Sequence, residues 1–161
     1  ARLPLEPEWE YACRAGTSTR FWSGDTGADL ARVGWSNDAM GNGGNAKGHP
    51  HPVAQKPKNA WGLYDVHGNV WEWCADVYDG ESYAPRAGGL TVDPRGLTFA
   101  VGNALQISAK SADCGTSRVM RGGSWYDWPV FARSAYRYGD SPSNSSWVLG
   151  FRLLLCPPER P

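Results

Sequence analysis

The sequence predicts a single α+β domain built of short helices, short strands and long loops. Its length of 161 residues is typical of one domain. Its 20 glycines and 12 prolines favour turns and loops over long helices. Nine tryptophans, seven tyrosines and four phenylalanines supply the bulk for a core.

The first expected element is a short helix over residues 6–14. Pro7 fits its first turn, where a missing N–H costs nothing, and Gly16 is expected to end it. Trp9 and Cys13, at i and i+4, share an apolar face. The three glutamates of this stretch favour the positive end of a helix, and we expect them on a solvated face rather than as an acid/base pair.

Residues 17–58 are predicted to be mostly loop, because they are rich in Gly, Asn, Asp, Ser and Pro. His49 and His51 stand in a His-Pro-His-Pro turn. Two histidines are candidate metal ligands, but such a turn is more typical of a plain loop.

The stretch 59–74 is the densest motif. A tight turn leads into an alternating strand, in which Glu72 stands between Trp71 and Trp73. A carboxylate between two tryptophans is expected to be partly buried and to need a partner. Two partners fit: an arginine of the C-terminal half, or a Ca²⁺ held by Asp65, Glu72 and the loop carbonyls between them. The residues alone favour the ion pair. The arginines that qualify are Arg121, Arg133, Arg137 and Arg152.

The four cysteines have no metal-binding spacing such as CxxC. Cys13 and Cys74 stand beside aromatic residues and are expected to be small buried hydrophobic residues. Cys114 and Cys156 flank the C-terminal motifs and are candidates for a disulfide. The sequence also lacks a GxxxxGK[ST] or GxGxxG phosphate loop and a recognisable Ser-His-Asp pattern.

Charge and hydropathy exclude several classes of partner. The net charge is zero and the pI is about 7.0, which argues against nucleic acid and against anionic membrane surfaces. No apolar run approaches the ~18 residues that span a bilayer, so direct membrane insertion is not expected. Because the chain opens at Ala1, without Met and inside a structured motif, we expect an upstream segment, with any export signal, to be absent from this sequence.

The stretch 121–152 has rigid ends and a polar, aromatic middle. It opens on the glycine turn RGGSW and closes on a strand-like run from 149 to 155. Between them lie three Tyr, two Trp, one Phe and five Ser, with no period of 2 or 3.6. This composition is typical of binding loops, in which Tyr and Trp give contact area and Ser and Gly adapt. The alternative is an irregular surface loop that holds a few core aromatics.

Seven motifs, taken in order, carry a family resemblance. They are RLP at 2–4, EWEYA at 8–12, NAWGLYD at 59–65, HGNVWEW at 67–73, RGGSW at 121–125, RSAYR at 133–137 and GFR at 150–152. As a set they resemble the formylglycine-generating enzyme, or sulfatase-modifying factor, family. The resemblance covers nearly the whole chain and implies one domain over 1–161 with a variant of the C-type lectin fold, the N-terminal part of the family domain being absent.

The enzymes of this family oxidise a substrate cysteine with two active-site cysteines that lie between the glycine turn and the final strand. This sequence has no cysteine from Gly115 to Leu155, and Asp127 stands in that region. Thiolate chemistry therefore lacks its nucleophile. The related iron-dependent sulfoxide synthases need a histidine cluster, and three histidines in two separate turns do not supply one. The sequence therefore predicts a protein that is not an enzyme.

The C-terminal stretch has a narrower resemblance, to the variable proteins of diversity-generating retroelements. These share the fold and end in a frame like RGGSW…P…RSA.R…P…GFRL, which this chain matches from 121 to 153. Between the fixed letters the residues vary, and Ala132 and Gly139 belong to the typical set, whereas Trp128 and Trp147 do not derive from the usual Asn codon. The varied side chains are expected to project from a scaffold that does not need them. The ligand-binding residues so implied are Tyr126, Asp127, Trp128, Val130, Phe131, Tyr136, Tyr138, Asp140, Ser143, Ser145, Ser146 and Trp147.

The family resemblance also bears on calcium. Family enzymes hold a structural Ca²⁺ at positions that match the side chains of Asp65 and Glu72 and the carbonyls of Gly68 and Val70. All four residue types are compatible with the ion. With the resemblance included, Ca²⁺ and an arginine are equally good candidates for the partner of Glu72. No other cofactor is expected.

Together the resemblances imply a non-catalytic variable protein whose C-terminal hypervariable region, 121–152, binds a protein or glycan on another cell, a host or a phage target. Such proteins are commonly displayed at a cell surface, in some cases anchored as lipoproteins, or on a phage particle. Two rivals stay open: a catalytic formylglycine-generating or sulfoxide-synthase-like oxidase, and a structural paralogue without sequence diversity.

Overall fold

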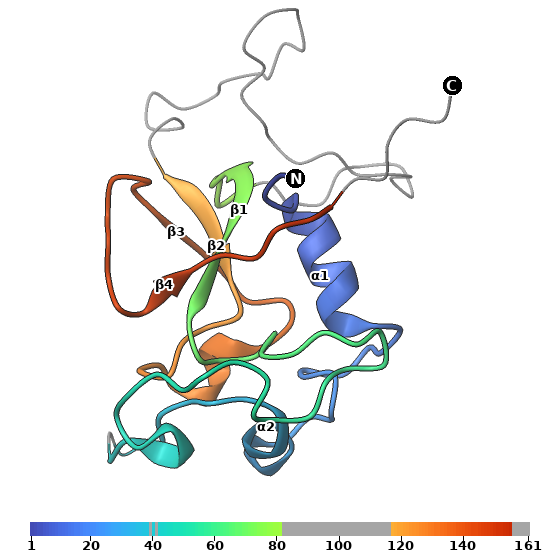
Figure 1. Ribbon diagram of the computed structural model, residues 1–161, viewed down its shortest axis with the longest axis vertical. Coiled ribbons are helices and arrows are strands. Elements are labelled where there is room, and N and C mark those ends of the chain that lie inside the picture. Colours follow the sequence, from blue (N-terminus) through green and yellow to red (C-terminus); the bar gives the residue numbers. More distant parts are fainter. Residues whose placement is uncertain (39, 41, 82–116, 156–161) are drawn as a thin grey trace, which may run out of the picture.

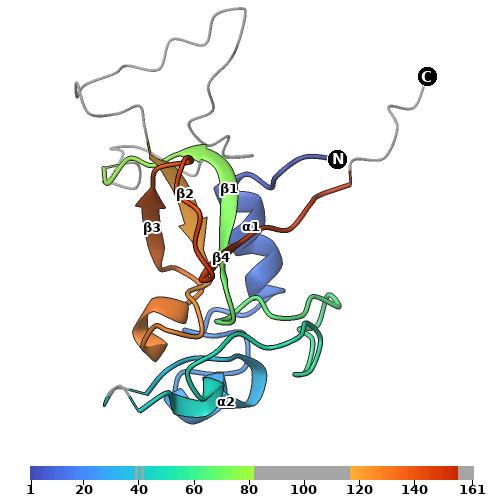
Figure 2. The ribbon, with the colours of Figure 1, turned by 60° about the vertical axis from the view of Figure 1, so that its left-hand side comes forward.

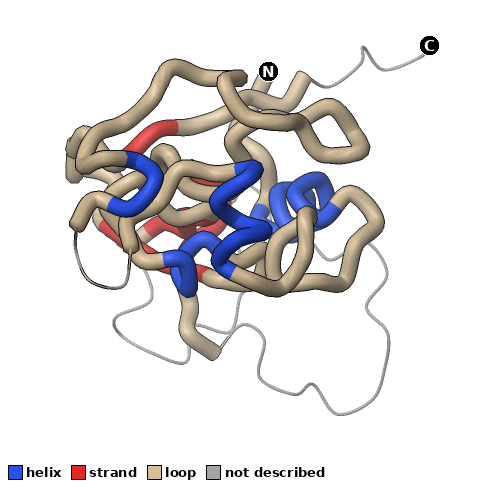
Figure 3. The backbone as a smooth tube through the Cα atoms, turned by 90° about the horizontal axis from the view of Figure 1, so that it is seen from below, coloured by secondary structure: helices blue, strands red, loops and turns tan. Residues whose placement is uncertain are grey.

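The computed structural model describes residues 1–38, 40, 42–81 and 117–155 (Figure 1). The predicted α+β fold of short elements is confirmed, and Figure 3 shows how much of the described chain is loop. The helices are α1 (Glu6–Arg14) and α2 (Gly27–Val33), with 3-10 turns η1 (Gly44–Ala46) and η2 (Pro129–Ala132). The strands are β1 (Trp71–Val77), β2 (Arg118–Arg121), β3 (Arg137–Asp140) and β4 (Leu149–Gly150).

The four strands form one sheet in the order β3-β2-β1-β4. β2 pairs antiparallel with β1 and with β3, so that Arg121 lies opposite both Glu72 and Arg137. Residues directly opposite one another in antiparallel strands share a face of the sheet. The register therefore places one acidic and two basic side chains in a row on a single face, and α1 packs beside the sheet (Figures 1 and 2).

Helix α1 buries the face that the sequence predicts. Trp9 and Cys13 pack with Val66, Cys74 and Val119 in the main core, which confirms both cysteines as buried hydrophobic residues. A smaller cluster of Phe21, Leu30 and Ala132 joins α2 to η2. The loops and the C-terminal half of the chain thus share one interior with the first helix.

The ends of α1 differ slightly from expectation. Leu5 provides no side-chain cap; instead its backbone N–H donates to the Glu8 carboxylate, at 2.7 Å. At the other end Ala15, with φ of 45°, takes the left-handed conformation one residue before the expected Gly16. The helix nevertheless has the predicted length.

Two glycine turns meet near the bottom of β1. The Gly68 N–H donates to the Gly122 carbonyl, at 2.7 Å, and the Asn69 N–H donates to the Trp35 carbonyl, at 2.8 Å. Gly68 has φ of +75°, and a Cβ there would lie 2.0 Å from the Trp35 oxygen. Only glycine fits so close an approach to Trp35. The hydrogen bond from Gly68 to Gly122 ties the HGN turn to the RGGSW turn.

The strand-like C-terminal run is a strand only at Leu149 and Gly150, where it pairs parallel with β1. Farther on, Leu154 pairs with Arg2 through two backbone hydrogen bonds, at 2.8 and 3.1 Å. Cys114 and Cys156, the candidates for a disulfide, lie outside the described residues. Within the described part of the chain, no helix has the length and apolar character needed to cross a membrane.

Candidate ligand-binding face and its supporting framework

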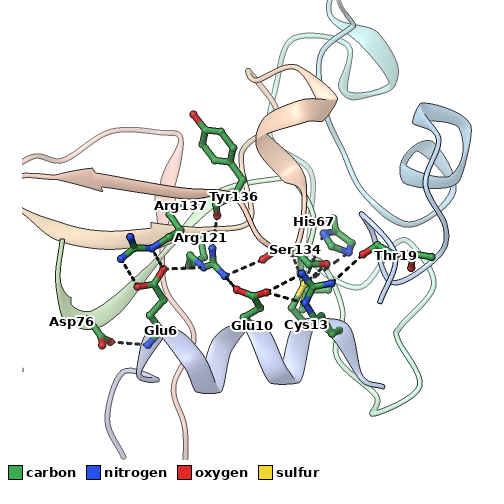
Figure 4. Close-up of polar contacts among 12 residues, drawn as sticks. Glu6, Glu10, Cys13, Thr19, His67, Asp76, Arg121, Ser134, Tyr136 and Arg137 are labelled. Atoms are coloured by element: carbon green, nitrogen blue, oxygen red, sulfur yellow. Dashed lines mark hydrogen bonds and ion pairs between the residues drawn. The ribbon is translucent and has the colours of Figure 1, made fainter. Parts of the chain in front are cut away.

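Arg121 is the most deeply buried large side chain beside the candidate face, with 0% of its surface exposed. Its guanidinium donates to the backbone carbonyls of Ser134, at 2.9 Å, and Tyr136, at 2.6 Å (Figure 4). It also forms an ion pair with Glu10. Arg121 therefore fixes the backbone between η2 and β3 to helix α1.

Arg137 makes the second link between this region and α1. Its Nε and Nη2 bond the two oxygens of Glu6, at 2.5 and 2.8 Å, in the two-pronged geometry that favours arginine over lysine (Figure 4). Glu6 is buried, so the expectation of a solvated glutamate face is wrong for this residue. The reason is tertiary: Arg121, which is buried, and Arg137, which is half-buried, require carboxylate partners, and α1 provides them.

Asp76 lies at the first turn of α1, where its Oδ2 accepts a hydrogen bond from the Glu6 N–H, at 2.6 Å. Burial raises the pKa of Asp76 to about 6, and the neighbouring Glu6 carboxylate acts in the same direction. This carboxyl group is therefore poised to take up a proton in mildly acidic solution.

Glu72 has found an arginine as its partner. Both of its oxygens bond the Arg152 guanidinium, and Oε2 also accepts from the Trp9 indole N–H, at 2.6 Å. Arg152 in addition donates to the Tyr64 carbonyl, at 3.0 Å. Of the two partners that the sequence left open, the described structure contains the ion pair.

The four residues implied as calcium ligands do not fit the ion as a set. Asp65 is suited in part: its Oδ2 accepts from the Ala54 N–H, at 2.7 Å, while its buried Oδ1 has no partner among the described residues. Glu72, however, has both oxygens engaged by Arg152 and Trp9. Gly68 and Val70 offer only carbonyls, which alone do not supply the charge that Ca²⁺ ligand sets contain. Among the described residues no group of three or more His, Cys, Asp or Glu is arranged so that it could hold a metal ion.

The two histidines of the predicted turn are used for packing. His51 stacks on Trp35, with ring centroids 3.8 Å apart, and His49 lies 4.5 Å from His51. The Lys56 ammonium group lies over the Trp35 ring, with its Nζ 4.1 Å from the ring centre.

His67 is a structural residue that the sequence did not single out. Its Nδ1 donates to the Ala132 carbonyl, at 2.8 Å, and its Nε2 accepts from the Trp22 N–H, at 3.0 Å. Burial lowers the pKa of His67 to about 4, so the ring is neutral at pH 7. The imidazole thereby joins the loop after α1 to η2, and with it to the candidate face. The only sequence signal was its place in the HGN turn.

The twelve residues predicted to bind ligand, here named the variable face, all lie at least partly at the surface. The side chains of Tyr126 and Trp147 are 65% and 82% exposed, and those of Trp128 and Tyr138 are both 50% exposed. Val130, Ser143, Ser145 and Ser146 are exposed as well, whereas Asp127, Phe131, Tyr136 and Asp140 are half-buried.

The half-buried members are held by their neighbours. Asp127 accepts from the Ser124 N–H and hydroxyl, at 3.0 and 2.5 Å, which closes the turn after the glycines. Phe131 packs edge-on against Tyr136, with ring centroids 5.0 Å apart. Asp140 accepts from the Asn144 side-chain amide, at 2.6 Å. These residues give shape to the variable face, while the exposed aromatics offer contact area.

Two residues that the resemblance placed in the freely varying set are constrained. Ala132 is fully buried, and its neighbour in space is the Gly123 backbone: a Cβ on Gly123 would lie 3.0 Å from the Ala132 Cα. A Cβ on Gly139 would lie 2.3 Å from the Tyr78 ring. The expectation that all varied positions are free of the scaffold is wrong here, because both sites face packed groups.

The chain matches the family model described as "Sulfatase-modifying factor enzyme 1-like domain" over residues 1–156. It is 31% identical to a formylglycine-generating enzyme of Thermomonospora curvata, over 97% of this chain and 50% of that protein. It is 34% identical to the formylglycine-generating enzyme of Streptomyces coelicolor, over 94% of this chain and 45% of that protein. The chain thus spans about half the length of these curated relatives.

Among solved structures, the fold is similar to that of Treponema denticola variable protein 1, with a TM-score of 0.66 and 31% identity. The match covers 93% of this chain and 45% of that one. The expected C-type lectin architecture of the formylglycine-generating type is confirmed by this likeness together with the family match.

Proposed function

The chain belongs to the family of sulfatase-modifying factor enzyme 1-like domains, and we propose that it is a non-catalytic member that binds a ligand through the variable face. The observation that carries the proposal is the exposure of large aromatic side chains, among them Tyr126, Trp128 and Trp147, on a backbone that the buried Arg121 holds in place. Exposed Tyr and Trp on a rigid support are the residues that dominate binding energy at interfaces.

The variable face has the properties of a surface whose residues can change. The side chains of Tyr126 and Trp147 contribute little to the packed interior, since most of each side chain is in solvent. The interior contacts of the region come from framework residues such as Arg121, Arg137 and Ser134. Replacing the exposed residues would therefore change which ligand is bound without unfolding the protein.

The two cysteines that the structure describes support a protein without the family's oxidase chemistry. Cys13 and Cys74 are buried, and burial raises the pKa of both thiols, that of Cys13 to about 12. A thiol nucleophile has to ionise and reach its substrate, and these two do neither at neutral pH. The sequence between Gly115 and Leu155, where the family's active cysteines lie, has none.

The partner that we propose is a protein or glycan on another cell, a host or a phage target. The likeness to Treponema denticola variable protein 1 supports a role in which sequence variation serves recognition. Display at a cell surface or on a phage particle, through a segment outside this sequence, is part of the same proposal.

Sequencing the locus across many cells of the source population tests this function without knowledge of the ligand. We expect amino-acid differences to concentrate at exposed positions such as 126, 128, 138 and 147, with Arg121, Arg137 and the two turn glycines unchanged. A reverse transcriptase gene and a near-repeat of the codons for 122–151 are expected nearby. A uniform sequence with no such repeat would contradict the proposal and favour a structural paralogue.

The oxidase rival is favoured by the identity to two formylglycine-generating enzymes. It is tested by incubating the purified protein, with and without copper, with a sulfatase-derived cysteine peptide and measuring the peptide mass. We expect no conversion of cysteine to formylglycine. Conversion of the peptide would overturn the non-catalytic assignment, and replacement of Cys13 and Cys74 by Ser would then show whether these two thiols take part.

A further inference from the structure

A pocket of about 500 Å³ lies beside the variable face, between the loop after α1 and the chain that leads into β3. Its volume falls within the ~300–1,000 Å³ typical of small-ligand sites. Four arginines and a single aspartate line it: Arg14, Arg20, Arg133, Arg137 and Asp25. The excess of positive charge in a concave site favours an anion.

Two of the four guanidiniums are already committed. Arg14 pairs with Glu10 and donates to the Thr19 carbonyl, at 3.1 Å. Arg137 pairs with Glu6. The carboxylates behind the pocket therefore neutralise these two arginines and belong to the framework.

Arg20 and Arg133 are not matched in this way. The Arg20 backbone is fixed on both sides: its N–H donates to Asp25, at 2.9 Å, and its carbonyl accepts from Ser134, at 2.8 Å. Its side chain is exposed and makes no hydrogen bond or ion pair with the described residues. Arg133 uses only Nε, which donates to the Val130 carbonyl at 2.8 Å, and it forms no ion pair within the described part of the chain.

The rest of the lining suits a sugar ring. The aromatic residues Tyr78 and Tyr136 line it, and so do the hydroxyl-bearing residues Ser18 and Thr19. Arg133 already lies 5.8 Å from the Tyr136 ring centre, and Phe131 of the variable face packs on the same ring. Aromatic residues, hydrogen-bonding groups and two guanidiniums that have no carboxylate partner among the described residues together match a ring that carries a carboxylate.

We propose that this pocket binds an acidic monosaccharide, as the terminal group of a glycan ligand that the variable face also contacts. The inference rests on the proposed function, because it specifies one chemical group, a charged sugar, of the ligand that the variable face is proposed to bind. The two cationic groups of the pocket would be constant, because Arg20 lies outside 121–152 and Arg133 belongs to the fixed frame, whereas Tyr136 of the pocket wall belongs to the variable face. The variable face would then select among glycans that share the acid.

The test is an NMR titration of the protein with the methyl glycosides of N-acetylneuraminic acid and glucuronic acid, against methyl glucoside and N-acetylglucosamine. For single sugars of this size we expect a Kd of about 1 mM. Amide shifts should gather at Arg20, Ser134 and Tyr136, and binding should weaken as salt is raised. The neutral sugars should produce no saturable shifts.

The double variant Arg20→Gln and Arg133→Gln should lose about tenfold or more in affinity for the acidic sugars. Arg32→Gln is the matched control, since Arg32 is an exposed arginine on α2 paired with Asp29, and its affinity should equal that of the wild type. Equal binding of neutral sugars, or unchanged affinity in the double variant, would overturn the proposal. So would an N-acetyl glutamate amide that binds more tightly than both sugar acids, which would favour an acidic protein partner.

The same titration separates this inference from the proposed function. Tyr126→Ala with Trp147→Ala removes exposed aromatics that do not line the pocket, and free sugar acids should bind this variant as they bind the wild type. If locus sequencing finds no variation but the sugar acids bind, the pocket stands and the variable face fails. If variation is found but no sugar acid binds, only the pocket assignment fails.

Discussion

The buried arginine framework and the exposed aromatic face alternate along the same stretch of chain, yet they use their side chains in opposite ways. Arg121 is wholly buried and bonds two backbone carbonyls and Glu10, whereas Tyr126, five residues later, is 65% exposed. Arg121 holds the backbone through charge-assisted hydrogen bonds, whereas the Tyr126 side chain lies mostly in solvent. The difference indicates that the residue that fixes the shape of the backbone is not the one that presents a large aromatic surface to solvent.

The largest effect is expected at the framework. Arg121→Leu leaves the Ser134 and Tyr136 carbonyls without their donor and deprives Glu6 and Glu10 of one cation each. We expect a loss of about 3–5 kcal/mol in the free energy of unfolding, which urea denaturation followed by tryptophan fluorescence would measure.

Arg32→Ala is the control for that experiment, because its ion pair with Asp29 is exposed and spans a single helical turn. The expected loss there is about 0.5 kcal/mol or less. If Arg121→Leu were no more damaging than Arg32→Ala, the idea of an arginine framework would have to be abandoned.

The next prediction compares a buried and an exposed position of η2, to test where the framework ends and the variable face begins. Ala132→Tyr places a large ring at a fully buried position beside the Gly123 backbone, and overpacking of this kind costs about 1–3 kcal/mol or more. Val130→Tyr, two residues earlier on an exposed site, should change the free energy of unfolding by about 0.5 kcal/mol or less. Equal stability of the two variants would show that η2 repacks and that Ala132 belongs to the variable face after all.

Two buried groups, His67 and Asp76, are expected to change the free energy of unfolding with pH in opposite directions. The pKa of His67 is lowered to about 4, so its contribution to stability is present above pH 6.5 and is lost as the pH falls toward 4. The pKa of Asp76 is raised to about 6, so the folded protein gains stability as the pH falls from 6 to 3.8. In this window the two trends oppose each other.

Asp76→Asn keeps an oxygen that can accept from the Glu6 N–H and removes the second trend. Between pH 7 and 4 the variant should lose on the order of 3 kcal/mol relative to the wild type. Urea denaturation at a series of pH values would measure it. A constant difference between the two proteins would mean that Asp76 titrates normally.

The smallest change in stability is expected on the variable face. Tyr126→Ala and Trp147→Ala remove side chains that are mostly in solvent, and each should alter the free energy of unfolding by about 0.5 kcal/mol or less. Thermal and urea unfolding would measure this. A loss of several kcal/mol would mean that the aromatics support the fold and are not free to vary.

Several features followed from local sequence. The α1 helix follows from Pro7, the acidic first turn and the spacing of Trp9 and Cys13, and β1 follows from the alternation around Glu72. The exposure of Tyr126 and Trp147 was expected from the resemblance to variable proteins, because the composition of the stretch alone left a loop with core aromatics open as an alternative. The choice of partner was not local. Four arginines qualified for Glu72, and only the place of Arg152 after β4 decided among them.

The sequence by itself determined the family and the short elements, because these depend on residue type and on spacing along the chain. The tertiary structure alone decided which arginine meets which carboxylate, that Ala132 and Gly139 are confined, and that Arg20 comes to lie beside Arg133. The physical reason is that strand register and the docking of the loop after α1 bring together groups more than a hundred residues apart, and their distances are set by packing rather than by sequence separation.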